Sequence, residues 1–112
     1  MNEDTICAPA TAPVHAPIAL IRVSGPDSIR VVSEMFSGAG KIEHRKAVYG
    51  TIQDGGTLVD DVMVTCYHEP ASYTGEEMAE ISCHGNPLIV NRILGILTEK
   101  GCRIAEPGEF TR

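Results

Sequence analysis

The chain has 112 residues, of which 43% are hydrophobic and 21% are charged, and its formal net charge is −6. This length predicts one domain with a modest hydrophobic core. Nine Lys and Arg side chains against fifteen Asp and Glu argue against independent nucleic-acid binding, which needs a concentrated positive surface. No apolar run approaches the roughly 20 residues of a membrane span.

The beginning of the chain and its cysteines indicate a cellular compartment. The segment Met1 to Asp4 is acidic and lacks the basic flank of a signal peptide, so we expect a cytoplasmic protein. The cysteines show no CxxC spacing, which argues against a zinc site and favours free, partly buried thiols. They are Cys7, Cys66, Cys83 and Cys102.

The first third of the chain predicts two strands and a helix. Thr5 to Ala8 is a short candidate strand, and the apolar run Ile18 to Val23 is typical of a central strand. Ser24 or Gly25 is expected to cap the helix that follows, with Pro26 in its first turn. Apolar residues at helical spacing give this helix one buried face, and the segment Gly38-Ala39-Gly40 is expected to end it. The apolar residues are Ile29, Val32 and Phe36.

The middle of the chain predicts a β-hairpin. Lys46 to Gln53 and Leu58 to Tyr67 alternate in polarity and flank the turn Asp54-Gly55-Gly56. Asp60-Asp61 could be a metal-binding pair. The alternative is that both are solvated residues near the start of a strand. That interpretation is several times more frequent when no further carboxylates lie at ligand spacing.

The most informative stretch runs from Ser72 to Gly85. Ser72-Tyr73-Thr74-Gly75 predicts a turn, and Met78 to Cys83 predicts a short strand whose alternate residues face opposite sides. After it, Asn86-Pro87 predicts the capped start of a second helix, which Gly101 ends. Cys102 to Ala105 is a candidate final strand.

Two charged residues stand inside these apolar strands. Arg22 either forms an ion pair at the strand end or clamps an anion or carbonyl of a ligand with its planar fork of donors. Glu80 either faces water on the polar side of its strand or meets a ligand that carries hydrogen-bond donors. The residues alone leave both alternatives open.

Together these elements predict an α+β domain in which two helices pack on one face of a mixed sheet. The order GxxxxGK[ST] of a phosphate-binding loop occurs nowhere in the 112 residues. This polypeptide is therefore not expected to bind GTP or ATP by that mechanism.

Several segments coincide with one family. They are Asp4-Thr5-Ile6, Ile21-Arg22-Val23-Ser24-Gly25, Ser72-Tyr73-Thr74-Gly75-Glu76, Glu80-Ile81, Cys83-His84-Gly85 and Glu106-Pro107-Gly108-Glu109-Phe110-Thr111. In order and spacing they resemble the N-terminal domain of the MnmE (TrmE) family of tRNA modification GTPases, formerly called thiophene and furan oxidation proteins. The resemblance covers essentially residues 1–112.

The resemblance implies a fold like that of the tetrahydrofolate-binding domain of glycine cleavage T-protein. It implies that the domain binds a folate such as 5-formyl- or 5,10-methylene-tetrahydrofolate and forms a homodimer. The full-length proteins carry helical and GTPase domains, the latter with GTP, magnesium and potassium sites that lie outside this chain. With the flavoprotein MnmG they modify the wobble uridine of tRNA, so the domain alone is not expected to be an enzyme.

Two residues match the family's folate contacts: Arg22 and Glu80. No catalytic or metal-ligating residue is carried over. A third folate contact, a lysine just after the Gly-Glu-Phe motif, falls beyond Arg112. The loop Thr11 to Pro17 also departs from the family, which usually has a glycine-rich segment there.

Three other functions are compatible with the residues. The first is a structural dimerisation module without folate, and the second is a folate-dependent enzyme resembling an aminomethyltransferase, for which 112 residues is short. The third is a thiol hydrolase that uses Cys83 and His84. Adjacent residues of a strand project to opposite sides, which argues against that pair.

Overall fold

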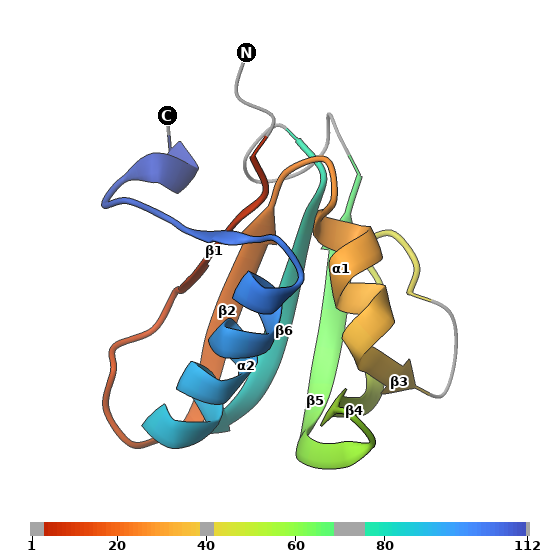
Figure 1. The fold of residues 1–112 in the computed structure, drawn as a ribbon, viewed down its shortest axis with the longest axis vertical. Coiled ribbons are helices and arrows are strands. Elements are labelled where there is room, and N and C mark those ends of the chain that lie inside the picture. Colours follow the sequence, from red (N-terminus) through yellow and green to blue (C-terminus); the bar gives the residue numbers. More distant parts are fainter. Residues whose placement is uncertain (1–3, 39–41, 69–75, 112) are drawn as a thin grey trace.

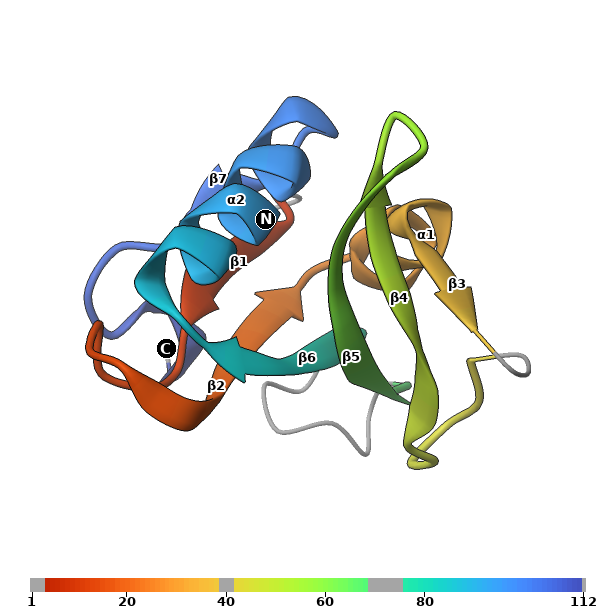
Figure 2. The ribbon, with the colours of Figure 1, turned by 90° about the horizontal axis from the view of Figure 1, so that it is seen from below.

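The computed structural model describes residues 4–38, 42–68 and 76–111. Among them, the strands form one seven-stranded sheet in the order β3-β4-β5-β6-β2-β1-β7. Both α-helices lie on the same face of this curved sheet (Figures 1 and 2). The elements are β1 (Ile6–Pro9), β2 (Ala16–Ser24), α1 (Ser28–Met35), β3 (Phe36–Gly38), β4 (Val48–Asp54), β5 (Thr57–Tyr67), β6 (Met78–Gly85), α2 (Pro87–Glu99), β7 (Arg103–Ile104) and the 3₁₀ turn η1 (Glu109–Thr111).

The sheet is mixed, as the sequence predicts. β1 and β7 pair in parallel, and the other neighbouring strands pair in antiparallel fashion. The predicted hairpin is confirmed as β4 and β5, joined at the turn that contains Gly55 and Gly56, both at positive φ. The α+β class is therefore confirmed, with both helices on one face.

The core lies between the helices and the sheet. Alternate residues of β2, β5 and β6 face this core, while the residues between them face the helix-free side, as expected from strand periodicity. The fully buried positions include Ile21, Val64 and Ile81 in the strands and Ile93 and Leu97 in α2. All four cysteines are free thiols and buried, which confirms that expectation.

The second helix begins and ends where the sequence predicts. Asn86 is the N-cap, and its side chain accepts a hydrogen bond of 2.9 Å from the backbone N–H of Leu88, while Pro87 occupies the first turn. At the other end Gly101 has a φ of 105°, a left-handed conformation that glycine adopts without a steric penalty.

The prediction for the first helix is wrong at both ends. The helix begins at Ser28, with Asp27 as a cap residue that makes no side-chain capping bond. Gly25 instead turns the chain at a φ of 137°, and Thr5 Oγ1 accepts a hydrogen bond from the Asp27 backbone N–H at 3.0 Å. At the C-terminal end Phe36 leaves the helix and begins β3, because it pairs with Ile52 of β4.

Two predicted features lie outside the described residues: the turn Ser72-Tyr73-Thr74-Gly75, and Ala39-Gly40 within the expected helix stop. In the part of the chain that the structure does describe, none of the helices has the length and apolarity needed to cross a membrane.

Candidate ligand site on the helix-free face of the sheet

The helix-free face carries the polar residues that interrupt the strands. In the register of β2, β6 and β5, Arg22 lies opposite Glu80, and Glu80 lies opposite Thr65. Because side chains directly across from one another share a face, these three form a row across the centre of the sheet. The fold thus brings together the two residues that the family resemblance marks as ligand contacts.

Arg22 and Glu80 form an ion pair with each other. Arg22 Nε donates to Glu80 Oε2 at 2.8 Å, and the side chains are 29% and 18% exposed. Arg22 lies two residues before the end of β2 and Glu80 two residues after the start of β6, which agrees with the alternative of an ion pair at the strand end. Both groups remain within reach of solvent, as a ligand site requires.

Tyr67 is a third member of this cluster, and the sequence analysis missed it. Its hydroxyl donates to Glu80 Oε1 at 3.3 Å, so both carboxylate oxygens of Glu80 are hydrogen-bonded. Burial and, secondarily, the charge of Glu80 raise the pKa of Tyr67, which keeps its hydroxyl in the donating form. Strand alternation places Tyr67 on the face of Thr65, but only the sheet register shows that its hydroxyl reaches Glu80.

More polar contacts surround this end of the sheet. Ser24, which is fully buried, donates from its hydroxyl to Glu76 Oε1 at 3.0 Å. His44 Nδ1 accepts a hydrogen bond of 2.8 Å from the backbone N–H of His68, and the His44 ring meets Tyr67 edge-on at 6.4 Å between centroids. Glu76 therefore belongs to the folded polar network.

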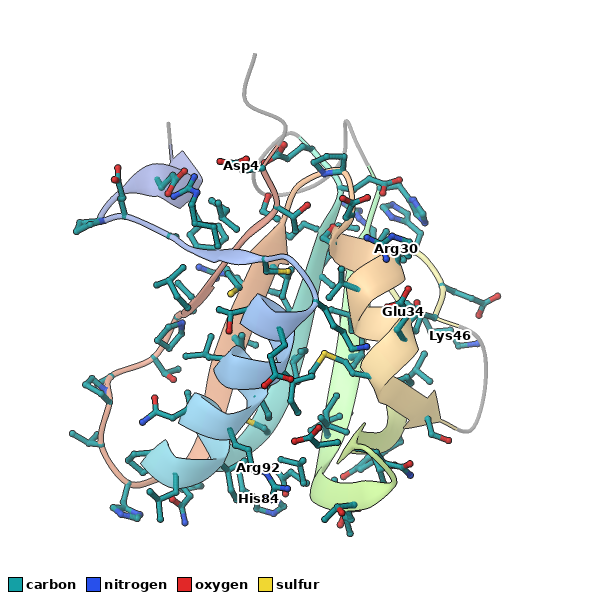
Figure 3. The ribbon with its side chains drawn as sticks, viewed as in Figure 1. Asp4, Arg30, Glu34, Lys46, His84 and Arg92 are labelled. Atoms are coloured by element: carbon teal, nitrogen blue, oxygen red, sulfur yellow. The ribbon has the colours of Figure 1, made fainter. Side chains whose placement is uncertain are left out.

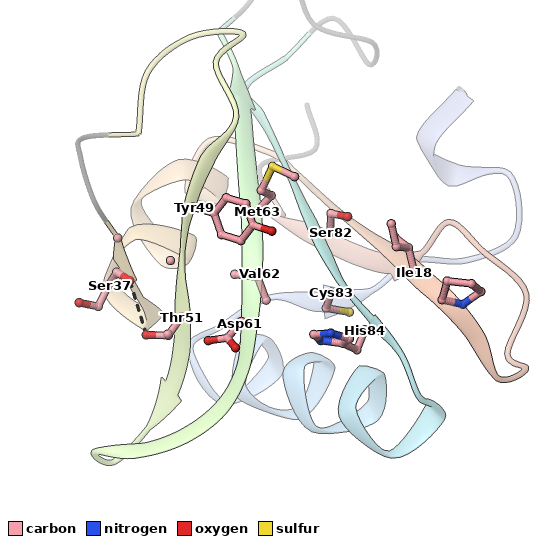
Figure 4. A pocket seen from close by; sticks show the side chains of 13 residues that line it. Ile18, Ser37, Tyr49, Thr51, Asp61, Val62, Met63, Ser82, Cys83 and His84 are labelled. Atoms are coloured by element: carbon pink, nitrogen blue, oxygen red, sulfur yellow. Dashed lines mark hydrogen bonds between the residues drawn. The ribbon is translucent and has the colours of Figure 1, made fainter.

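The other end of the same face is more apolar and is hollowed. A concave space of about 750 Å³ lies over β4, β5 and β6 and reaches Ile18 of β2 (Figure 4). Tyr49 and Met63 contribute the large side chains, and Ser82 and His84 line the β6 side.

Asp60 lies beside this hollow and is not the solvated residue that the sequence suggests. It is 8% exposed, its carboxylate accepts from the backbone N–H of His84, and its other oxygen lies 2.7 Å from Nδ1 of the His84 ring. Its neighbour Asp61 is exposed, as expected. Within the described residues, no group of three or more His, Cys, Asp or Glu side chains could hold a metal ion.

The structure also argues against a thiol hydrolase. Cys83 is 4% exposed whereas His84 is exposed, as expected for neighbouring residues of a strand whose side chains project to opposite sides. Burial, with a smaller effect of Asp60, raises the pKa of Cys83 to about 11. A buried thiol that stays protonated at neutral pH is a poor nucleophile.

A comparison with protein families decides which family this fold represents. The model of the family "GTP-binding protein TrmE N-terminus" matches residues 5–112. The chain belongs to this family. The match begins just before β1 and includes both Arg22 and Glu80.

Curated relatives of the TrmE N-terminus family agree with this assignment. The chain is 50% identical over 117 residues to the tRNA modification GTPase MnmE of Porphyromonas gingivalis, covering 99% of this chain and 25% of that protein. Its identity is 49% to the protein of that name from Thermotoga maritima, over 97% of this chain and 24% of the relative. The identity to the protein of that name from Bacteroides thetaiotaomicron is 44%, over 100% of this chain and 25% of the relative. The chain thus spans about a quarter of the length of these relatives.

Proposed function

We propose that residues 1–112 are the N-terminal domain of a tRNA modification GTPase and bind a reduced folate, 5-formyl- or 5,10-methylene-tetrahydrofolate. The observation that carries the folate proposal is the Arg22–Glu80 pair, completed by Tyr67, on a sheet face that the helices leave uncovered. In this proposal the GTP, magnesium and potassium sites belong to the remaining three quarters of the protein.

Glu80 is suited to the pterin ring. A pterin presents an amino group and a ring N–H side by side, and a carboxylate has two oxygens at matching spacing. Each carboxylate oxygen can accept more than one hydrogen bond, so the bonds from Arg22 and Tyr67 leave Glu80 able to accept from a ligand. Because β6 fixes the backbone of Glu80, little ordering is needed when the ligand binds.

Arg22 is suited to an electronegative group of the same ligand. Its guanidinium presents donors in a planar fork that matches a carbonyl or carboxylate, and one edge already orients Glu80. The residues present therefore fit two of the three contacts that the family resemblance implies, the third being the lysine beyond Arg112. We expect this fold to resemble that of the tetrahydrofolate-binding domain of glycine cleavage T-protein.

Calorimetric titration with 5-formyltetrahydrofolate tests the folate proposal. We expect saturable binding by the parent chain and at least about tenfold weaker binding by Glu80→Gln, since 1.4 kcal/mol corresponds to tenfold. If the parent chain gives no binding heat and no shift of its amide NMR signals, the folate proposal is wrong. The structural dimerisation module without folate is then the function that remains. Transfer of a one-carbon group to or from the folate, catalysed by the chain alone, would favour the aminomethyltransferase-like alternative.

Homodimerisation is the second part of the proposal. The described surface exposes several large apolar side chains, and covering some of them with a second copy would stabilise a chain of this size. They are Val14, Ile18, Tyr49, Leu58, Met63, Leu88 and Ile104. Sedimentation at roughly tens of micromolar, a range suited to modest affinity, should show a dimer. Whichever of Tyr49→Glu and Leu88→Glu weakens the dimer in sedimentation identifies the face that a second copy covers. A parent chain that sediments only as a monomer contradicts the proposal.

The partners of the longer protein follow from the same proposal. We expect a cytoplasmic protein that acts with MnmG on the wobble uridine of tRNA, through parts beyond this chain. The chain alone, with its charge of −6 and no phosphate-binding loop, should neither hydrolyse GTP nor bind tRNA tightly. A GTPase rate in a clean preparation, or a sub-micromolar tRNA complex on the usual affinity scale, would contradict this expectation.

A further inference from the structure

His84 is oriented by a buried carboxylate. Asp60 Oδ1 lies 2.7 Å from His84 Nδ1, and Asp60 Oδ2 accepts from the His84 backbone N–H at 2.8 Å. In the Nδ1–H tautomer the ring donates to this carboxylate, and Nε2, the other ring nitrogen, is then an acceptor. Asp60 is 8% exposed while the His84 side chain is 65% exposed. The buried carboxylate therefore fixes the orientation of a ring that a ligand can reach.

This ring borders the hollow on the helix-free face. The hollow, at about 750 Å³, has the size of a small-molecule site. Figure 4 shows Tyr49 and Met63 at one end of it, with Asp61, Thr51 and His84 toward the other. An aromatic ring and a thioether are favourable contacts for a planar aromatic ligand.

The charge of the lining indicates which ligands fit. Among the described residues that line the hollow there is no Lys or Arg, and Asp61 brings a carboxylate. The Asp61 carboxylate and, in the Nδ1–H tautomer, Nε2 of His84 can both accept hydrogen bonds, so donor groups on a neutral or cationic ligand are favoured. An anionic ligand would meet only like charge at Asp61.

We propose that this hollow binds a planar aromatic ring that carries N–H donors, with Nε2 of His84 and the Asp61 carboxylate as the acceptors. This site is separate from the Arg22–Glu80 pair. Glu80 and His84 lie four residues apart on β6, which corresponds to roughly 13 Å along a strand. The proposal does not depend on folate binding.

Benzamidine and benzoate form a matched pair of probes. Both have the same aromatic ring, and they differ in carrying an amidinium with N–H donors or a carboxylate. Titration of the chain with each, followed by NMR of the His84 ring and the Met63 methyl group, should show saturable shifts with benzamidine only. His84→Ala and Asp61→Asn should each weaken benzamidine binding at least about tenfold, whereas Asp54→Asn in the exposed hairpin turn should leave it unchanged.

Four results would overturn the proposal. They are no saturable shift with benzamidine, equal binding of benzoate, parent-like affinity in Asp61→Asn, and shifts that follow protein concentration instead of probe concentration. The last would mean that a second copy covers the hollow. Asp61 is exposed and has no structural role of its own in the core, so its variant keeps the test decisive if His84→Ala does not fold.

Discussion

The substitution Glu80→Gln separates a ligand contact from a structural role. Glutamine keeps the shape of Glu80 and an oxygen that can accept from Arg22, and its amide can donate to the Tyr67 hydroxyl, which can also accept. The loss to folding is the charge on a pair whose side chains are 29% and 18% exposed. Discounted for that exposure, we expect the free energy of unfolding to fall by about 1 kcal/mol or less.

The same substitution should affect folate binding more strongly. The second N–H of the amide would face a ligand donor, and neither of these two donors would have an acceptor, at a cost of roughly 1–3 kcal/mol. That corresponds to about tenfold weaker binding or more. Calorimetry with 5-formyltetrahydrofolate measures the affinity, and urea unfolding followed by circular dichroism measures the stability.

Glu34→Gln is the matched control. Glu34 is a carboxylate on the exposed side of α1, where it pairs with Arg30 at 2.9 Å (Figure 3). Its substitution should cost at most roughly 0.5 kcal/mol of stability and change no folate affinity. If Glu80→Gln binds reduced folate as tightly as the parent, or loses binding only in proportion to a large loss of stability, the assignment of Glu80 to the pterin is wrong.

Three further predictions concern other parts of the chain. Arg22→Lys should bind folate more weakly than the parent in the same titration, because lysine is a point charge without the planar fork, and equal affinity would refute the fork argument. Gly85→Ala should destabilise the domain in urea unfolding, since an added Cβ would lie 2.1 Å from the Ala16 carbonyl oxygen. Gly95→Ala should stabilise the domain by about 0.5–1 kcal/mol, because an added Cβ on α2 would lie in open space. A Gly85→Ala variant more stable than Gly95→Ala would contradict the packing described. Iodoacetamide at pH 7 should label Cys83 in the folded chain at least about 100-fold more slowly than in urea, because its pKa of about 11 leaves little thiolate, and rapid labelling by mass spectrometry would contradict this.

Periodicity and turn chemistry were sufficient to predict the central part of the fold. The alternation in Met78 to Cys83, the glycines between β4 and β5, and the Asn86-Pro87 cap are local signals, and the structure confirms each of them. The first helix was predicted less well, because its ends depend on non-local contacts. Thr5 holds the turn before it, and β4 draws Phe36 into β3.

The candidate site shows the same division between local and non-local information. The sequence singled out Arg22 and Glu80, but their pairing depends on the register between β2 and β6. Tyr67 and the bond between Asp60 and His84 join residues 13 and 24 positions apart, and no local pattern indicates such contacts. Register is set by the whole sheet, so these contacts emerge only once the strand order is known.

A crystal structure of the chain with 5-formyltetrahydrofolate tests the central claim most directly. We expect the pterin ring on the helix-free face, with its amino group and ring N–H donating to the Glu80 carboxylate and the Arg22 guanidinium on an oxygen of the ligand. A folate bound on the helix side, or on the helix-free face without contact to either residue, would contradict the account.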